Sequence, residues 1–387
     1  MRRSRSSFPY CIQLLTKSIM PVVLALIWSR TVAAQTWTWS IEAVDTSARF
    51  TSLAVDHQGN VHLSYADGDA RNLRYAFRQA DTSRWFTMTV DSQLNEFSTH
   101  LTLDGDDRPH ICYTPRMLKY AYWDGKDWKI LRVQPRGQIE FTCSVAIASD
   151  GTPSLAWYEK NGADGLDHLH LKYATFKDGT WLARTVDSEG ESGKWSSMIL
   201  DASGNATIVY SRYPNCALKL AQWDGKNWRI MVVDPYSDDR NRGMGNSLVR
   251  DSQGNLQVSY YDDEGLRYAI EHDGHWAIQT VDAVSPIGGW QGLWSSMVLD
   301  RHGFPHISYD DSGMLKHAFW DGTRWHVQLI ARSGGDAVRY SSIGIGSDDT
   351  IYISYRDPTD GSLQVARGRL TVAPQQAAAA APSAKKN

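Results

Sequence analysis

Three side chains with complementary chemistry lie within a short stretch of the chain: His100, Tyr113 and Arg116. A histidine can remove a proton, a phenol can protonate a leaving oxygen, and a guanidinium can neutralise a carboxylate. These groups are the ones that β-elimination beside a uronate carboxylate requires, and Tyr158 is a second candidate for the acid. One hypothesis is therefore an enzyme that cleaves an acidic polysaccharide, with these four residues as its catalytic set.

A second set of side chains suits binding. Aromatic residues recur just before a repeated strand, and three of them are Trp195, Trp294 and Tyr340. Trp290 lies outside that pattern, in a glycine-flanked loop. The electron-rich face of an aromatic ring attracts the polarised C–H groups of a sugar. We expect these four residues to bind a glycan, and the alternative is that they fill gaps between structural units.

Arginines form a further layer of candidate ligand-binding residues: Arg212, Arg240, Arg242 and Arg356. On one face of the molecule they would offer bidentate donors to a carboxylate or a sulfate. Neighbouring carboxylates, among them Asp238, are the alternative partners for these guanidinium groups.

The sequence predicts no cofactor and no metal site. One loop has the residue types for a divalent cation, namely Asp164, Asp167, His168 and His170. Their spacing has neither the length nor the order of an EF-hand loop or a zinc motif, so a solvated loop is the preferred interpretation.

A repeat must position all of these residues. Its most regular segment has the form W-x4-V-D, which begins at Trp39, Trp85, Trp181, Trp228 and Trp276, with looser copies at Trp128 and Trp325. Four short runs rich in β-branched and aromatic residues make up one unit, separated by Gly, Asp and Asn. The units start near 52, 100, 144, 197, 247, 296 and 342, at spacings of 44 to 53 residues. Four strands in each unit of this length are typical of a propeller blade.

The two ends of the repeat complete each other. Residues 36–45 have the form of a fourth strand with no unit before them, and the unit from Ser342 stops before its tryptophan. The sequence therefore predicts an all-β fold, a seven-bladed β-propeller over residues 35–370. Its ring is closed by the N-terminal strand, which joins the C-terminal blade, and closure removes exposed sheet edges.

One position departs from the repeat. The first residue of the unit is serine in six copies and His100 in the second. First strands line the central channel of a propeller, so we expect His100 to face the channel or its mouth.

The repeat pattern resembles that of secreted bacterial seven-bladed propellers with sialidase-like (BNR-type) repeats, and it is similar to that of propeller lectins. The resemblance covers Trp39 to about Arg369, although the Asp-box S-x-D-x-G-x-x-W of sialidases is absent. Some seven-bladed polysaccharide lyases have a similar architecture and use a His, a Tyr and an Arg near the channel. By residue type, the resemblance implies these roles for His100, Tyr113 and Arg116.

The two ends of the chain have other roles. Basic residues precede an apolar run from Ile19 to Trp28, and a small-residue cleavage site follows, so residues 1–34 read as a secretory signal peptide. Loss of its five basic residues would take the net charge from −3 to −8 at pH 7. We therefore expect a secreted or periplasmic protein with no stable membrane insertion and no nucleic-acid partner. Residues 371–387 are rich in Ala and Pro and predict a disordered tail.

Three cysteines follow the signal segment: Cys112, Cys143 and Cys216. An odd number argues against a disulfide scaffold. We expect Cys112 and Cys143 to be small core residues, and the sequence leaves open which cysteines, if any, are paired.

These observations leave three functional hypotheses. The first is carbohydrate recognition on the loop face around the channel, with a glycan or polysaccharide as the partner. The second is the elimination enzyme described above, or a glycosidase. The third is a non-catalytic scaffold whose partner is an envelope protein, which the fold alone allows equally.

Overall fold

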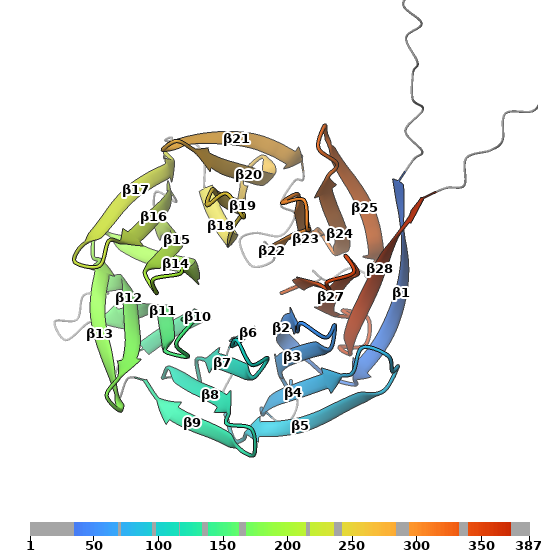
Figure 1. The fold of residues 1–387 in the computed structure, drawn as a ribbon, viewed down its shortest axis with the longest axis horizontal. Helices are drawn as coiled ribbons and strands as arrows, with labels where there is room; N and C mark the ends of the chain where they lie inside the picture. The colour runs from blue at the N-terminus through green and yellow to red at the C-terminus, as the bar shows by residue number, and fades with distance from the viewer. Residues whose placement is uncertain are drawn as a thin grey trace, which may run out of the picture. The chain divides into compact units, whose positions relative to one another are not determined.

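The computed structural model describes residues 35–68, 71–94, 98–115, 117–133, 138–161, 168–213, 217–235, 242–283, 294–332 and 340–372. Their strands form seven antiparallel four-stranded sheets arranged in a ring (Figure 1). The first strand of each sheet lies nearest the axis and the fourth lies at the rim. The predicted seven-bladed β-propeller is confirmed.

Four blades come from the first half of the ring. Blade one contains β2 (Arg49–Val55), β3 (Val61–Ala66), β4 (Leu73–Arg78) and β5 (Trp85–Asp91). Blade two contains β6 (Thr99–Leu103), β7 (Pro109–Tyr113), β8 (Lys119–Trp123) and β9 (Trp128–Arg132). Blade three contains β10 (Gln138–Ile147), β11 (Pro153–Asn161), β12 (His168–Lys177) and β13 (Thr180–Asp187). Blade four contains β14 (Glu191–Leu200), β15 (Ala206–Tyr213), β16 (Ala217–Trp223) and β17 (Trp228–Asp234).

Three blades complete it. Blade five contains β18 (Arg242–Arg250), β19 (Leu256–Asp262), β20 (Gly265–His272) and β21 (His275–Asp282). Blade six contains β22 (Ser295–Leu299), β23 (Pro305–Asp311), β24 (Met314–Trp320) and β25 (Trp325–Arg332). Blade seven contains β26 (Ser342–Ile345), β27 (Ile351–Arg356), β28 (Leu363–Val372) and β1 (Gln35–Asp45).

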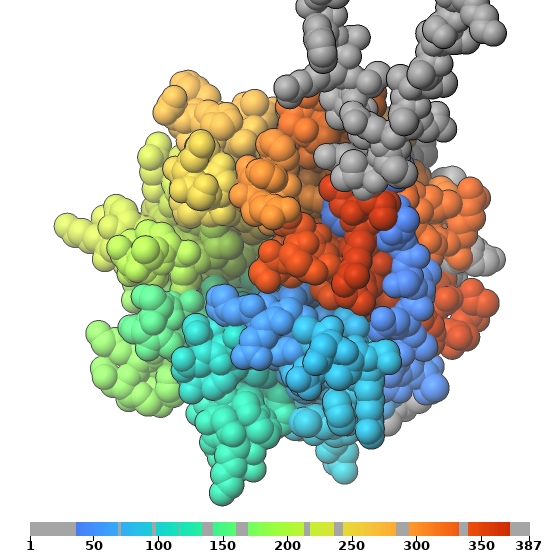
Figure 2. Space-filling model, turned by 45° about the vertical axis from the view of Figure 1, so that its right-hand side comes forward, coloured from blue at the N-terminus to red at the C-terminus, as the bar shows by residue number. Residues whose placement is uncertain are grey.

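The N-terminal strand closes the ring as predicted. The order of the seventh sheet is β1-β28-β27-β26, so its outermost strand comes from the opposite end of the chain. Figure 2 shows this blue strand beside the red C-terminal strands. The Thr371 hydroxyl donates to the Thr36 carbonyl at 2.8 Å, and β28 continues to Val372, past the predicted boundary at 370.

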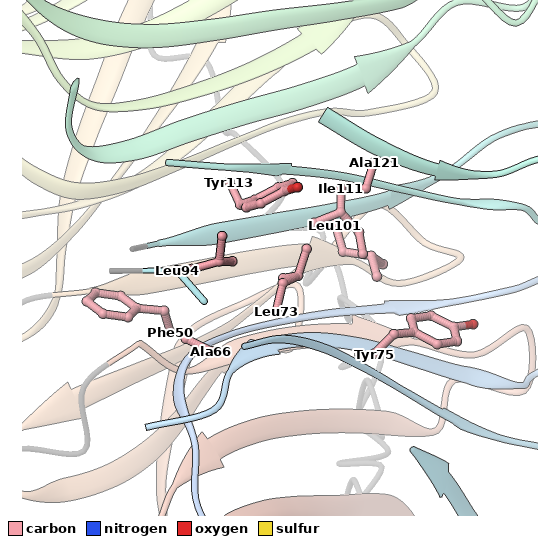
Figure 3. Packing of buried hydrophobic residues seen from close by; sticks show 9 residues of the cluster. All are labelled: Phe50, Ala66, Leu73, Tyr75, Leu94, Leu101, Ile111, Tyr113 and Ala121. Carbon is pink, nitrogen blue, oxygen red and sulfur yellow. The ribbon is translucent and has the colours of Figure 1, made fainter. Parts of the chain in front are cut away.

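Burial follows strand position. All side chains of β3 are buried, because a second strand has a neighbouring blade on each face. Most of β5, at the rim, is exposed. The junction of blades one and two shows the resulting core, in which Leu101, Ile111 and Tyr113 pack against Ala66, Leu73 and Tyr75 (Figure 3). Alternation with period two therefore sends one face of each second strand into each neighbouring junction.

The aspartate of W-x4-V-D bonds the next blade. Its carboxylate accepts a hydrogen bond from a second-strand tyrosine hydroxyl, and we name this contact the outer bond. Five junctions have it: Asp45–Tyr65, Asp91–Tyr113, Asp187–Tyr210, Asp234–Tyr260 and Asp282–Tyr309, at 2.6 to 2.7 Å. In the two looser copies, Gln134 and Ala331 stand where the aspartate would be. The last residue of the motif thus joins neighbouring blades.

A second contact between blades lies nearer the axis, and we name it the inner pair. One partner is the second-strand residue that pairs with the recurring first-strand residue of its own blade, as Ser64 pairs with Ser52. The other partner lies in the next blade, just before the recurring first-strand residue there, as Thr99 precedes His100. Four junctions have two hydroxyls there: Ser64–Thr99, Ser259–Ser295, Ser308–Ser341 and Thr51–Ser354, at 2.9 to 3.1 Å.

The junction of blades two and three has a disulfide at the inner pair. Cys112 and Cys143 are bonded, and both are buried. Both are core residues, as predicted, and the structure settles the pairing that the sequence left open. An odd number of cysteines excludes the pairing of all three but allows one disulfide. Cys112 and Cys143 occupy the two positions of the inner pair at this junction, which brings their sulfur atoms together.

Among the described residues, no helix is long and apolar enough to cross a membrane.

Candidate functional site: the central channel

A cavity of about 580 Å³ lies where the first strands of all seven blades meet. Among the described residues that line it, no Asp, Glu, Lys or Arg occurs. Serine and threonine hydroxyls supply most of the polar atoms, and His100 contributes an imidazole. The cavity is thus a polar but uncharged environment over the described part of its wall.

The recurring serines form a ring of hydrogen bonds around this cavity. Each accepts from a backbone N–H of the next blade, and His100 does the same through Nδ1. The acceptor–donor pairs are Ser52–Leu101, His100–Val145, Ser144–Met198, Ser197–Leu248, Ser247–Met297, Ser296–Ile343 and Ser342–Leu53, at 2.9 to 3.3 Å. The first strand is the inner edge of its sheet, so some of its backbone N–H groups have no neighbouring strand to bond. The side chains of this ring accept hydrogen bonds from these groups. This ring explains why one small acceptor recurs in every blade.

His100 lines the cavity, as predicted, and takes the place of a serine in the ring. Its Nδ1 can accept the Val145 N–H only in the neutral form, which then carries its proton on Nε2. Burial lowers the pKa of His100 to about 4. A neutral imidazole at physiological pH follows from both observations.

Aromatic side chains surround the cavity mouth at the amino ends of the first strands. Trp195, Trp294 and Tyr340 line the cavity together with Phe50. The ring centroids of Phe50 and Tyr340 are 4.1 Å apart, and those of Trp294 and Tyr340 are 4.9 Å apart. The structure therefore brings together three of the four aromatic residues predicted to bind a ligand, and the fourth, Trp290, lies outside the described residues.

Three of these aromatics have an unusual backbone conformation. Phe50, Trp195 and Tyr340 have φ of 51°, 52° and 63°, and Gly245 has 54° at the same position in blade five. Phe50, Trp195 and Gly245 lie at irregularities in the pairing of the first and second strands. Such a bulge position normally takes glycine. A bulky side chain there costs about 1–2 kcal/mol. Phe50 offsets this cost as a buried member of the core between blades one and two, whereas Trp195 and Tyr340 are only partly buried against neighbouring core clusters.

The predicted arginines are not gathered at the cavity. Arg212 forms an ion pair with Glu189 at 3.2 Å, and Arg356 lies beside Gly361. Neither lines the cavity. Arg240 lies outside the described residues, and only the backbone of Arg242 is described, at the start of β18.

The proposed elimination residues are also separated. The Tyr113 hydroxyl donates to Asp91, and burial together with that carboxylate raises its pKa. Tyr113 and Tyr158 are buried and do not line the cavity that His100 faces. Arg116 lies outside the described residues. Among the described residues of this set, His100 therefore shares its cavity with neither Tyr113 nor Tyr158.

The candidate cation loop lies mostly outside the described residues. Asp164 and Asp167 belong to its undescribed part, while His168 and His170 belong to β12.

A smaller cavity of about 420 Å³ lies at the carboxyl ends of the first strands, and sequence reasoning missed it. A hydrogen bond between His57 and Asp107 and an ion pair between Arg301 and Asp349, both at 2.6 Å, join its blades. Its Asp56 carboxylate is engaged by its own turn, where Oδ1 accepts from the N–H groups of Gln58 and Asn60. Burial alone would raise the pKa of Asp56, but hydrogen bonds from Asn60 and His62 outweigh it and lower the pKa. These carboxylates are structural.

Comparison with known proteins places the chain among propellers. No family model and no curated protein matches the sequence. The fucose-specific lectin of Aleuria aurantia shares the fold at 14% identity and a TM-score of 0.51, over 76% of this chain and 99% of the lectin. The polysaccharide lyase Uly1 shares it at 8% identity and a TM-score of 0.52, over 82% and 88%. Kuenenia stuttgartiensis hydrazine synthase shares it at 10% and 0.56, over 81% and 94%. At these identities the likeness shows the fold alone, and the resemblance to sialidase-like repeats stays a prediction.

Proposed function

We propose that this propeller binds a glycan, with a sugar unit seated at the aromatic mouth of the central channel. Four blades contribute aromatic rings, which can stack on sugar C–H faces, to the cavity wall, and the same wall contains hydroxyl groups that can bond sugar oxygens. A lectin and a polysaccharide lyase with the same fold make a glycan a reasonable ligand class, although fold by itself does not determine function.

The backbone strain at the mouth carries the proposal. Gly245 shows that the bulge forms in blade five without a side chain, whereas Phe50, Trp195 and Tyr340 adopt the same positive φ at a cost. Strained residues of this kind concentrate at functional sites. We infer that Trp195 and Tyr340, which are only partly buried, are retained for the ligand in addition to their packing against the cores.

We further propose that the protein is exported. The basic and apolar pattern of residues 1–34 supports this, and so does the Cys112–Cys143 disulfide, because such bonds persist mainly in oxidising compartments.

The test is a glycan array with neutral and acidic oligosaccharides, probed with the protein as exported from cells. Trp195→Gly removes the ring and relieves the positive-φ strain. We expect its affinity for the best-binding glycan to fall about tenfold or more. Its melting temperature should also fall, because the ring packs against the core cluster that contains Met244.

Phe86→Ala is the matched control, because Phe86 is an aromatic residue on β5 at the rim, 47% exposed and away from the channel. It should bind as the unaltered protein does. Absence of binding to every glycan, or undiminished binding by Trp195→Gly, would contradict the proposal.

A further inference from the structure

Two of the seven inner pairs are incomplete, and both belong to blade four. At the junction of blades three and four, Ser196 faces the position of Ala156 instead of a hydroxyl. At the junction of blades four and five, Asn246 faces the position of Val209. The register shows the equivalence, because Ala156 pairs with Ser144 and Val209 pairs with Ser197, as Ser64 pairs with Ser52.

The incomplete pairs leave two buried polar atoms unsatisfied. Ser196 Oγ and Asn246 Oδ1 have no hydrogen-bond partner among the described residues, and each residue is only 8% exposed. A buried polar atom without a partner costs about 1–3 kcal/mol. Four other junctions show that a hydroxyl on the neighbouring second strand would remove this cost.

Both residues belong to the wall of the channel cavity, and their two unsatisfied atoms have almost no solvent-accessible surface. Ser196 and Asn246 line it at the same level on adjacent blades. Trp195 precedes one of them, and Gly245 precedes the other. This sector thus combines an aromatic ring, two unsatisfied polar groups and a glycine at a position where four blades have an aromatic residue.

The chemistry of the two atoms restricts the ligand. The Asn246 amide nitrogen donates to the Gly243 carbonyl at 3.1 Å, which leaves Oδ1 as an acceptor. An acceptor needs a hydroxyl or an N–H and repels carboxylate, sulfate and phosphate oxygens. Ser196 Oγ can donate or accept. Two hydroxyls on one face of a sugar would satisfy both groups.

We propose that Ser196 and Asn246 form an off-axis subsite that binds hydroxyl groups of a neutral sugar unit, with Trp195 beside its C–H face. This inference rests on the proposed glycan binding and adds the sector and the neutral character of the ligand. The unsatisfied atoms destabilise the empty protein, and the sugar hydroxyls supply their missing partners.

The test completes the missing pairs. Ala156→Ser supplies the hydroxyl found at other junctions, and Val209→Thr places one beside Asn246 with little change in shape. We expect each substitution to raise the melting temperature of the ligand-free protein by about 1–3 °C. Each should also weaken binding of the best neutral oligosaccharide roughly fivefold, as measured by calorimetry.

Ser308→Ala is the matched control, because it breaks the complete pair with Ser341 and Ser308 does not line the cavity. It should lower the melting temperature and leave affinity unchanged. Methyl glycosides of neutral hexoses and of the matching uronic acids form the second arm. The neutral compounds should bind more tightly.

Each contrary result has its own meaning. Unchanged melting temperatures in both Ala156→Ser and Val209→Thr would show that the incomplete pairs do not destabilise the protein. Unchanged affinity in both variants would overturn the subsite but not the proposed glycan binding. Tighter binding of the uronic acids would overturn its neutral character. Raised melting temperatures without sugar binding by the unaltered protein would overturn the proposed function and, with it, the sugar as occupant.

Discussion

The junction of blades two and three and the junction of blades three and four are held together in opposite ways. The first has the Cys112–Cys143 disulfide at its inner pair. It has no outer bond, because Gln134 replaces the aspartate and Trp157 stands at the tyrosine position. The second has an outer bond between Asp187 and Tyr210 and an incomplete inner pair.

The remaining five junctions have one or both of these contacts. Three of them have both contacts, the junction of blades six and seven has only the inner pair, and the junction of blades four and five has only the outer bond. The described residues thus give every junction at least one contact. At both junctions of blade four, the outer bond thus holds the blades together where the inner pair leaves a polar atom unsatisfied.

The disulfide should make the largest single contribution in this comparison. Replacing Cys112 and Cys143 together by serine recreates the hydroxyl pair of four other junctions, so the fold should survive. Loss of a crosslink spanning 31 residues should lower the free energy of unfolding by roughly 3–4 kcal/mol. Chemical denaturation measures this, and an unchanged value would show that the hydroxyl pair is equivalent to the bond.

Removing the carboxylate from the outer bond of blades three and four should cost somewhat less. Lys219 donates to Asp187 at 2.6 Å and is only 4% exposed. Asp187→Ala would leave this ammonium with Glu189 alone, at 3.2 Å. We expect a loss of about 2–3 kcal/mol in denaturation, and Asp187→Ala with Lys219→Met should recover part of it. Equal losses in the single and double variants would argue against a buried-charge cost.

Removing the phenol from the same bond should cost about 1–2 kcal/mol. Tyr210→Phe keeps the ring but deprives Asp187 of one donor. Tyr355→Phe is the control, because its junction has Ala331 in place of the aspartate, and it should change stability little. Similar losses in both variants would show that the outer bond does not matter.

The smallest effect should be a pH dependence at the channel ring. His100 has a pKa of about 4 in the folded protein against an ordinary value of 6.5, so only the unfolded chain gains its proton between these values. Stability should therefore fall as pH decreases from 6.5 toward 4. His100→Ser introduces the residue of the other six blades. It should remove about 1 kcal/mol of that loss at pH 6 and leave the pH dependence of stability above pH 7.5 unchanged. Melting temperatures measured across this pH range test the prediction. If they depend on pH identically in the variant and the unaltered protein, His100 does not cause the loss of stability.

The sequence by itself determined the blades, their number, their closure and the first-strand position that faces the channel. Strand alternation and turn residues act over a few neighbours, and repetition lets one unit identify the others. The departure at His100 and the aromatic residues Trp195, Trp294 and Tyr340 were visible for the same reason. Aligning second strands with the following unit would also have placed Cys112 against Cys143.

Only the tertiary structure decided which of these positions meet. Ser354 bonds Thr51 across 303 residues, and the positions of Ala156 and Val209 face Ser196 and Asn246 because blades pack side by side. Tyr113 is separated from His100 for another reason. Tyr113 pairs with Thr99, and Thr99 and His100 are neighbours on one strand, so the side chains of Tyr113 and His100 point to opposite faces of the sheet. The strained φ of Trp195 was equally hidden, because glycine rather than tryptophan is what such a position predicts. Contacts between blades depend on how sheets pack around an axis, and no local pattern in the chain encodes that packing.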